Sequence, residues 1–169
     1  MKHVIKVAAA VLLFMTAAGV ARAQSKTAHI NVSELLQAMP EMKAAQAELK
    51  RLEETYRADI QSSMEELRNR FTQYNNEASS MSEEENQKRA LELQSAERNI
   101  GEAQQAAQQE LGKKQSDLFE PISVKAKAAI EKVAAAQGYQ YVLDSSPGSG
   151  VIVATGKDLL PDVKKELGF

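Results

Sequence analysis

The stretch EMKAAQAELKRLEETYRADIQSSMEELRNRFTQYNNE, residues 41–77, decides how this chain folds. It contains neither Gly nor Pro, and its apolar residues recur at steps of three or four positions. The stripe is made by Ala45, Leu49, Leu52, Tyr56, Ile60, Met64, Leu67, Phe71, Tyr74 and Ala78. Because an α-helix repeats every 3.6 residues, this spacing predicts one continuous helix with a single apolar face.

A polar turn follows this helix at residues 75–82, and a second helical pattern follows the turn. Ser82 and Glu85 fit the capping box that starts a helix. The apolar stripe of residues 83–120 is rich in Ala and interrupted by two glycines, so this helix should be the softer one. Two helices of similar length joined by a short turn predict an antiparallel α-helical hairpin over residues 41–120, a coiled-coil-like arm about 57 Å long.

A strand and a short helix precede the arm. Residues 27–32 alternate between apolar and polar side chains, which is typical of a strand with one buried face. Ser33 is the expected N-cap of a short helix, and Pro40 ends that helix because the residue before a proline avoids the α conformation. We therefore assign residues 24–40 to a compact body.

Residues 121–169 are expected to complete that body with a helix, two strands and a terminal helix. Pro121 suits the first turn of a new helix, and Gly138 suits its carboxyl end. Residues 139–143 and 151–154 are rich in aromatic and β-branched side chains and are expected to form the strands. The predicted fold is α+β: a small β-sheet body that mediates oligomerisation, with the long hairpin inserted between its strands.

The first residues are predicted to be a signal peptide rather than part of the fold. Lys2 and Lys6 precede an apolar run at residues 7–20, and a small-x-small motif ends at Ala23. That run is shorter than the ~20 residues a membrane-spanning helix needs, although a membrane anchor is the alternative. We expect cleavage of residues 1–23 near Ala23 and a mature chain in the periplasm.

Composition excludes several kinds of chemistry. The chain has no Cys, so disulfides, thiolate nucleophiles and Cys-based metal sites are ruled out. Three basic residues leave with the signal peptide, which changes the formal net charge from −2 to −5. An acidic mature chain argues against nucleic acid as a partner, because phosphate contacts need a basic surface.

The predicted sheet is too small to be stable alone. Three short strands make a marginal sheet, and exposed strand edges favour pairing with another chain. Without disulfides or a metal, oligomerisation is the remaining way to bury more surface. We therefore expect a homo-oligomer whose shared body contains Ile30, Val32, Tyr139, Tyr141, Leu143, Val151 and Val153.

No constellation in the sequence predicts an enzyme. After processing, His29 is the only histidine, and a lone strand histidine is more often structural than catalytic. The loop at residues 145–150 lacks the Lys-Ser/Thr ending of a phosphate-binding loop. The acidic run at residues 83–85 lacks the ligand spacing of a calcium loop and suits a helix amino terminus. We expect no catalytic residues, no metal ligands, no cofactor and no enzymatic activity.

Both ends of the mature chain resemble one family. Residues 28–49, AHINVSELLQAMPEMKAAQAEL, resemble the amino-terminal signature of the Skp (OmpH-like) periplasmic chaperones. Residues 130–144, IEKVAAAQGYQYVLD, resemble the family's helix–Gly–Tyr–strand segment, and Asp158 with the final helix resembles its closing segment. The resemblance implies a homotrimer in which three hairpins enclose a cavity. It also implies binding of unfolded outer-membrane proteins, without ATP, before their insertion.

The charge of the arm departs from the family pattern. The best-known members are strongly basic, whereas residues 41–120 hold 17 acidic and 11 basic residues here. This difference argues against lipopolysaccharide binding, and a different set of client proteins is one consequence to test. Met64, Phe71 and Tyr74 near the tip are candidates for client contact, but their place in the apolar stripe favours the alternative that they seal the two helices together.

The sequence leaves one other function open. A helical hairpin also suits a periplasmic structural or adaptor protein that docks an envelope assembly through its tip. Such a tip should present a defined apolar or charged patch, and residues 75–82 are mostly small and polar. The sequence therefore favours a holdase chaperone over an adaptor.

Overall fold

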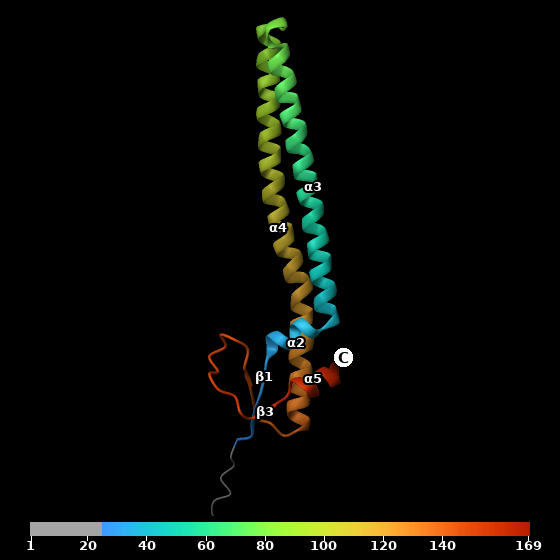
Figure 1. Cartoon of the computed structure of the whole chain (residues 1–169), viewed down its shortest axis with the longest axis vertical. Coiled ribbons are helices and arrows are strands. Elements are labelled where there is room, and N and C mark those ends of the chain that lie inside the picture. Colours follow the sequence, from blue (N-terminus) through green and yellow to red (C-terminus); the bar gives the residue numbers. More distant parts are fainter. Residues whose placement is uncertain (1–24) are drawn as a thin grey trace, which may run out of the picture.

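A computed structural model describes residues 25–169, and the predicted signal peptide over residues 1–23 lies outside them. The described chain forms a small body, from which two long helices project in one direction (Figure 1). Its elements in chain order are β1 (Thr27–Ile30), α2 (Val32–Ala38), α3 (Pro40–Glu77), the 3-10 turn η1 (Ala78–Ser80), α4 (Glu83–Ala136), β2 (Tyr141–Asp144), β3 (Lys157–Asp158) and α5 (Leu160–Leu167). The predicted combination of long helices with a small sheet is confirmed.

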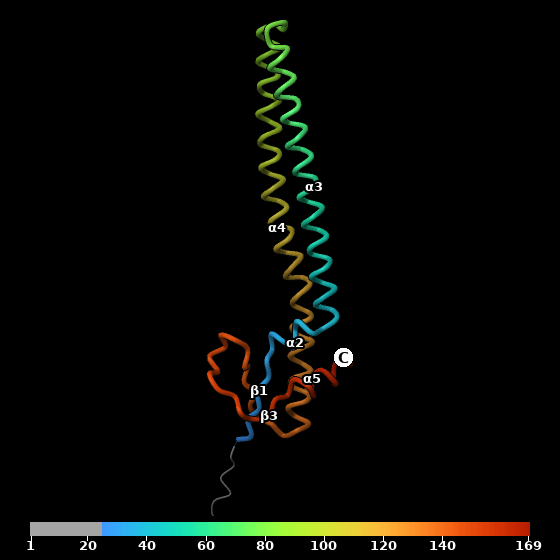
Figure 2. Tube along the Cα trace, in the orientation of Figure 1, coloured from blue at the N-terminus to red at the C-terminus, as the bar shows by residue number. Residues whose placement is uncertain are grey.

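The helices α3 and α4 lie side by side from the body to the tip, where η1 connects them (Figure 2). Side-chain pairs link Glu41 to Lys125, Glu48 to Lys114 and, near the tip, Tyr74 to Glu92. Residue numbers therefore rise along α3 as they fall along α4. We call α3 and the facing residues 83–120 of α4 the arm.

Prolines lie at the base of both arm helices but act differently. Pro40 is the first residue of α3, where its missing N–H costs no helical hydrogen bond. Pro121 was expected to start a new helix, and that prediction is wrong, because it lies inside α4, a single helix of 54 residues from Glu83 to Ala136. Ile122 and Ala126, in the two turns after the proline, are buried in the core of the body, and this burial favours the continuous helix.

The sheet has the strand order β2-β1-β3, and β1 pairs with both neighbours in parallel. A parallel pair needs a long crossover connection, and the whole arm supplies it between β1 and β2. Thr27 faces Tyr141 across the first pair, and His29 faces Asp158 across the second. The central strand of the sheet is thus the one nearest the amino terminus.

Several predicted boundaries differ from the structure. The first strand ends at Ile30, so Val32 begins α2 instead of ending a strand. Asn31 rather than Ser33 is the N-cap, and its side chain accepts a hydrogen bond from the Glu34 N–H at 2.9 Å. Tyr139 precedes β2 and lies outside it.

The strand predicted at residues 151–154 is absent from the described chain, and β3 is formed by Lys157–Asp158 instead. The free edge of β1 is short, and the segment leading directly into α5 occupies it. The Leu159 N–H donates to the His29 carbonyl at 2.9 Å, which continues that pairing into the final helix. Val151 and Val153 therefore find no strand partner within one chain.

The hydrophobic core lies in the body, between the sheet, α2, the end of α4 and α5. Its largest fully buried side chains are Ile30, Leu35, Met39, Leu159 and Val163. Gly138 continues the chain from α4 toward β2 with a φ of 71°, a left-handed conformation that glycine adopts without strain. Within α3 only Met42 and Ala45, both near the base, are buried. The body is therefore packed and the arm is largely open to solvent.

Candidate functional site

The two arm helices are joined by polar pairs along their length. At the base, the ammonium group of Lys125 donates to the Glu41 carboxylate, which lowers the pKa of Glu41. Further along, Lys114 Nζ lies 2.8 Å from Glu48 Oε1 and lowers the pKa of Glu48 in the same way. In mid-arm the Tyr56 hydroxyl donates to the Glu110 carboxylate, and this bond raises the pKa of Tyr56. These pairs set the register of the helices, but each lies at the surface and stabilises little by itself.

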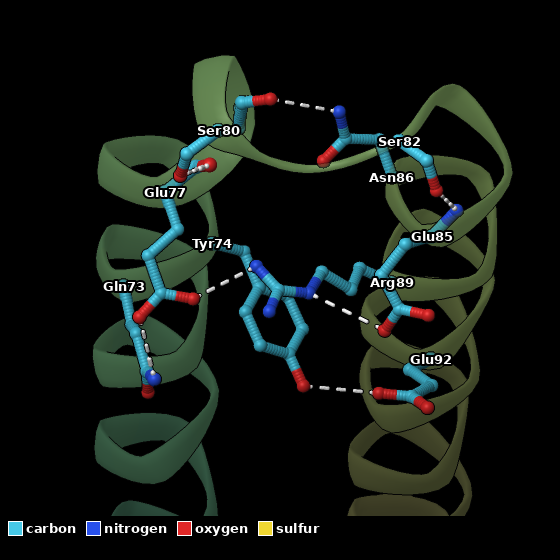
Figure 3. Close-up of polar contacts among 10 residues, drawn as sticks. Gln73, Tyr74, Glu77, Ser80, Ser82, Glu85, Asn86, Arg89 and Glu92 are labelled. Atoms are coloured by element: carbon cyan, nitrogen blue, oxygen red, sulfur yellow. Dashed lines mark hydrogen bonds and ion pairs between the residues drawn. The ribbon is translucent and has the colours of Figure 1, made fainter.

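The tip is closed by a cluster centred on Arg89 (Figure 3). The Arg89 guanidinium stacks over the Tyr74 ring, 4.5 Å from the ring centroid. Its Nη1 lies 2.9 Å from Glu77 Oε2, an ion pair without a well-aligned hydrogen bond, and its Nε lies 3.6 Å from Glu85 Oε1. The Tyr74 hydroxyl donates to Glu92 at 3.0 Å, so its pKa is raised. The cluster joins the end of α3 to the start of α4.

Small polar groups complete the turn. The Ser82 hydroxyl accepts a hydrogen bond from the Glu85 N–H at 3.2 Å, so the predicted capping role of Ser82 is confirmed. The Asn86 side-chain amide donates to the Ala78 carbonyl at 2.9 Å, and the Ser80 hydroxyl donates to the Glu77 carbonyl at 2.8 Å. Polar groups at the tip are therefore largely engaged with one another.

Grooves lie on both flanks of the seam in mid-arm. One cavity of about 560 Å³ opens on the flank that carries Asp59 and Ser63. A cavity of about 500 Å³ opens on the other flank, beside Met64 and Phe71. The cause is a mismatch in side-chain size, because α4 offers mainly alanines where α3 offers larger side chains. Ile60, Leu67, Ala96, Ile100, Ala103 and Ala107 form the floor of the first cavity.

The three candidates for client contact divide between two environments. Met64 and Phe71 remain 52% and 55% exposed beside the second groove, so neither is enclosed by the seam. Tyr74 is half-buried in the tip cluster and holds the helices together. Neither Arg89 nor Glu92 was predicted to contact α3, because partners across the two helices depend on where the turn falls. Counting outward from the tip would have placed them opposite Tyr74 and Glu77.

The outer face of the sheet carries exposed apolar side chains. Tyr141 is 60% exposed, and Leu143, two positions along the same strand, is 47% exposed. Alternate residues of a strand share one face, and Ala28 and Ile30 of β1 fill the opposite face with core contacts. The following loop adds Val153, which is also exposed.

The other residues expected in the oligomerisation body lie deeper in the molecule. Ile30 is buried in the core of a single chain. Val32 and Tyr139 are half-buried and pack against that core, and Val151 is half-buried in the loop. Of the predicted residues, Tyr141, Leu143 and Val153 are therefore the exposed ones, and Ile152, which was not predicted, is 96% exposed in the same loop.

His29 connects the two ends of the loop at residues 145–156. Its Nδ1 lies 3.2 Å from the Ser145 hydroxyl oxygen, and its Nε2 lies 3.3 Å from the Gly156 carbonyl oxygen. Because a carbonyl only accepts, Nε2 carries the proton and Nδ1 accepts from the Ser145 hydroxyl. In a catalytic triad a carboxylate orients the histidine ring, whereas here the Gly156 carbonyl does so. The geometry therefore favours a structural role for His29.

A second polar cluster fixes the start of the same loop. Ser146 is buried, and its hydroxyl lies 2.6 Å from the Asp144 carboxylate and 3.0 Å from the Asn31 side-chain oxygen. Burial raises the pKa of Asp144, but hydrogen bonds from Ser146 and from the Val32 N–H together outweigh it and lower that pKa. The loop therefore leaves the sheet in a defined direction.

Residues 25–169 contain neither a metal-binding cluster nor a helix suited to cross a membrane. No group of three or more His, Asp or Glu side chains in this range is arranged to hold a metal ion. None of the helices in the same range combines the length and the apolar character that a membrane crossing requires.

Comparison with known proteins places these features in a family. The family model described as outer membrane protein (OmpH-like) matches residues 26–167. A chaperone protein Skp from Pectobacterium atrosepticum is 24% identical over 160 residues, which cover 95% of this chain and 96% of that protein. A solved structure of a putative outer membrane chaperone (OmpH-like) from Caulobacter crescentus aligns with a TM-score of 0.77 at 18% identity, covering 86% of this chain and 85% of the other. The match spans both the body and the arm.

Proposed function

This chain belongs to the outer membrane protein (OmpH-like) family, and we propose that it is a periplasmic holdase chaperone. In this proposal it binds unfolded outer-membrane proteins without ATP and keeps them from aggregating before membrane insertion. A holdase works by lowering the concentration of free unfolded chain, which needs binding but no chemical step.

The observation that carries the proposal is the incomplete seam of the arm. Beyond Ala45, α3 buries no side chain fully, and Met64 and Phe71 keep about half of their surface in solvent. Apolar grooves flank the seam on both sides. An unfolded client presents many different apolar segments, so a long surface with weak and adaptable contacts suits it better than one sharp pocket.

The outer face of the sheet supports assembly into a homo-oligomer, which the family resemblance makes a homotrimer. Tyr141, Leu143 and Val153 form an apolar surface that would be covered by other copies of the chain. Val151 and Val153 would find strand partners in those copies, which accounts for a strand-like sequence without a strand partner in one chain. The antiparallel, coiled-coil-like hairpins would then project from a shared body and enclose a client.

Light scattering from a urea-diluted outer-membrane β-barrel tests this function. The mature chain, residues 24–169, is added in increasing amounts, and its assembly mass is measured in parallel. We expect aggregation to be suppressed at about one assembly per client. A well-folded oligomer that leaves aggregation unchanged would contradict the holdase and favour the adaptor function.

A further inference from the structure

The two flanks of the mid-arm seam carry different charge. The groove beside Met64 and Phe71 is lined by one basic and one acidic residue, Arg68 and Glu97, so its charge is balanced. The groove on the opposite flank is lined by Asp59, Glu66, Glu110 and Arg70, three acids against one base. We call this second cavity the acidic groove.

Two carboxylates of the acidic groove are not neutralised by any cation in residues 25–169. Arg70 Nη2 pairs with Glu66 Oε1 at 2.6 Å, which removes both of these charges from the balance. Glu110 accepts a hydrogen bond from the neutral hydroxyl of Tyr56, and the Asp59 carboxylate forms no ion pair within the described chain. The groove therefore combines an apolar floor with a net negative rim.

The dimensions of the acidic groove suit a piece of extended chain. Its lining on α3 runs from Tyr56 to Arg70, which corresponds to about 21 Å of helix at 1.5 Å per residue. About six residues of extended polypeptide span that length. In an extended chain, alternate side chains point to opposite sides, so apolar groups can meet the floor while their neighbours meet the rim.

We propose that the acidic groove binds unfolded segments in which apolar side chains are flanked by Lys or Arg. The proposal rests on the holdase function above and adds a preference among its clients. Apolar contact with the floor supplies adhesion, and the rim carboxylates favour a cationic neighbour over an anionic one. The preference follows from charges on this arm and from no property of the sheet or the tip.

Fluorescence anisotropy with two labelled peptides tests the preference. Both peptides share an alternating core of Val and Phe, and one carries Lys where the other carries Glu. At low salt we expect the mature chain to bind the Lys peptide about two- to fivefold more tightly, with the difference shrinking as salt screens the rim. Equal binding, or tighter binding of the Glu peptide, would overturn the proposal.

Matched variants locate the effect. The double variant Asp59→Asn with Glu110→Gln keeps the shape of both side chains and leaves Tyr56 a carbonyl acceptor, and it should abolish the preference. Glu65→Gln with Asp117→Asn removes the same two residue types from exposed positions outside the groove, and it should leave the preference intact. If both double variants lost the preference for the Lys peptide equally, the preference would come from the overall charge of the arm, and the acidic groove would be refuted as its source.

A third variant tests the apolar floor. Ala103→Leu fills part of the acidic groove with a larger side chain, so a bound segment can no longer reach the floor. The binding of both peptides should therefore weaken alike, by about two- to fivefold. Unchanged binding would contradict the groove as the binding place. The aggregation assay on the same proteins separates the holdase function from the charge preference. If the chain suppresses aggregation but binds both peptides equally, the holdase function stands and only the charge preference is refuted.

Discussion

Arg89 is the residue on which the closure of the tip depends. Only 14% of its side chain is exposed, and its guanidinium contacts Tyr74, Glu77 and Glu85 on both sides of the turn. Arg89→Ala removes the stacking on Tyr74, worth about 1 kcal/mol, while Ala itself favours the helix. We expect amide hydrogen exchange across residues 74–92 to accelerate by about fivefold. Lys88→Ala, at an exposed neighbouring position, is the control, and equal exchange in both variants would contradict the role of Arg89.

Asn31 and Ser33 distinguish the observed start of α2 from the predicted one. The Asn31 side-chain oxygen accepts from the Glu34 N–H and lies 3.0 Å from the Ser146 hydroxyl oxygen, whereas Ser33 is exposed. Asn31→Ala should lower the free energy of unfolding by about 1–2 kcal/mol, the usual cost of losing an N-cap. Ser33→Ala should change it by less than about 0.5 kcal/mol. Urea unfolding at one fixed protein concentration measures both, and a larger loss at Ser33 would restore the predicted cap.

These two positions show what local sequence decides at the scale of a residue. Ser and Asn cap helices about equally well, so residue preference alone could not choose between Ser33 and Asn31. The choice follows from the end of β1 at Ile30, which in turn depends on pairing with strands more than 100 positions away in the sequence. Ser82 was predicted as a cap because Glu85 follows it three positions later, and the structure keeps that assignment.

At the scale of elements, ion pairs between α3 and α4 make the arm sensitive to acid. The pKa of Glu41 is lowered from 4.5 by the hydrogen bond from Lys125, and that of Glu48 is lowered by Lys114. A carboxyl whose folded pKa is lowered contributes stability above its unfolded pKa and loses it as pH falls through the folded pKa. We therefore expect the thermal midpoint of the helices, followed by circular dichroism, to fall as the pH drops below about 4.5.

The variant Lys125→Met checks the origin of that acid sensitivity. It keeps the apolar stem and removes the cation beside Glu41, so the fall in midpoint below pH 4.5 should be smaller than in the parent chain. Lys43→Met removes an exposed cation that pairs with no carboxylate in the described chain, and it should keep the full acid dependence. An identical response in both variants would assign the acid loss to other carboxyl groups.

The sequence predicts the long helices better than the short strands. The apolar stripe of α3 extends over about nine turns, so its pattern is averaged over many residues and outweighs any single exception. The strands have two to four residues, too few for a clear pattern. Whether a segment forms a strand depends on whether it pairs with an edge of β1. The segment at residues 151–154 has the composition of a strand, but β3 occupies that edge and leads directly into α5.

At the scale of the whole molecule, the body and the arm separate two tasks. The core holds the sheet and the helix ends together, while the arm keeps its grooves unfilled and its charges exposed. The sequence indicated the thin packing of the arm, because the stripe of residues 83–120 is rich in Ala and too small to fill the space beside the larger side chains of α3. The acidic groove was not predictable in the same way, since it depends on which carboxylates of two different helices meet on one flank.

Copies of the chain are predicted to assemble through the outer face of the sheet. Tyr141 and Leu143 are exposed there, and replacing both with Lys would place two charges in the proposed interface. We expect the mature chain to have the mass of a homotrimer by light scattering coupled to size exclusion, and the double Lys variant to shift toward the monomer.

The control places a single lysine on an exposed apolar residue of the arm. Leu91→Lys changes a side chain that is 66% exposed on α4, far from the sheet, so the assembled mass should persist. Because Tyr141 and Leu143 contribute little to the core of one chain, the double variant should keep its helical content while losing partners. A variant that stays assembled would move the interface to another surface, and the enclosing arrangement of the arms would have to be derived again from there.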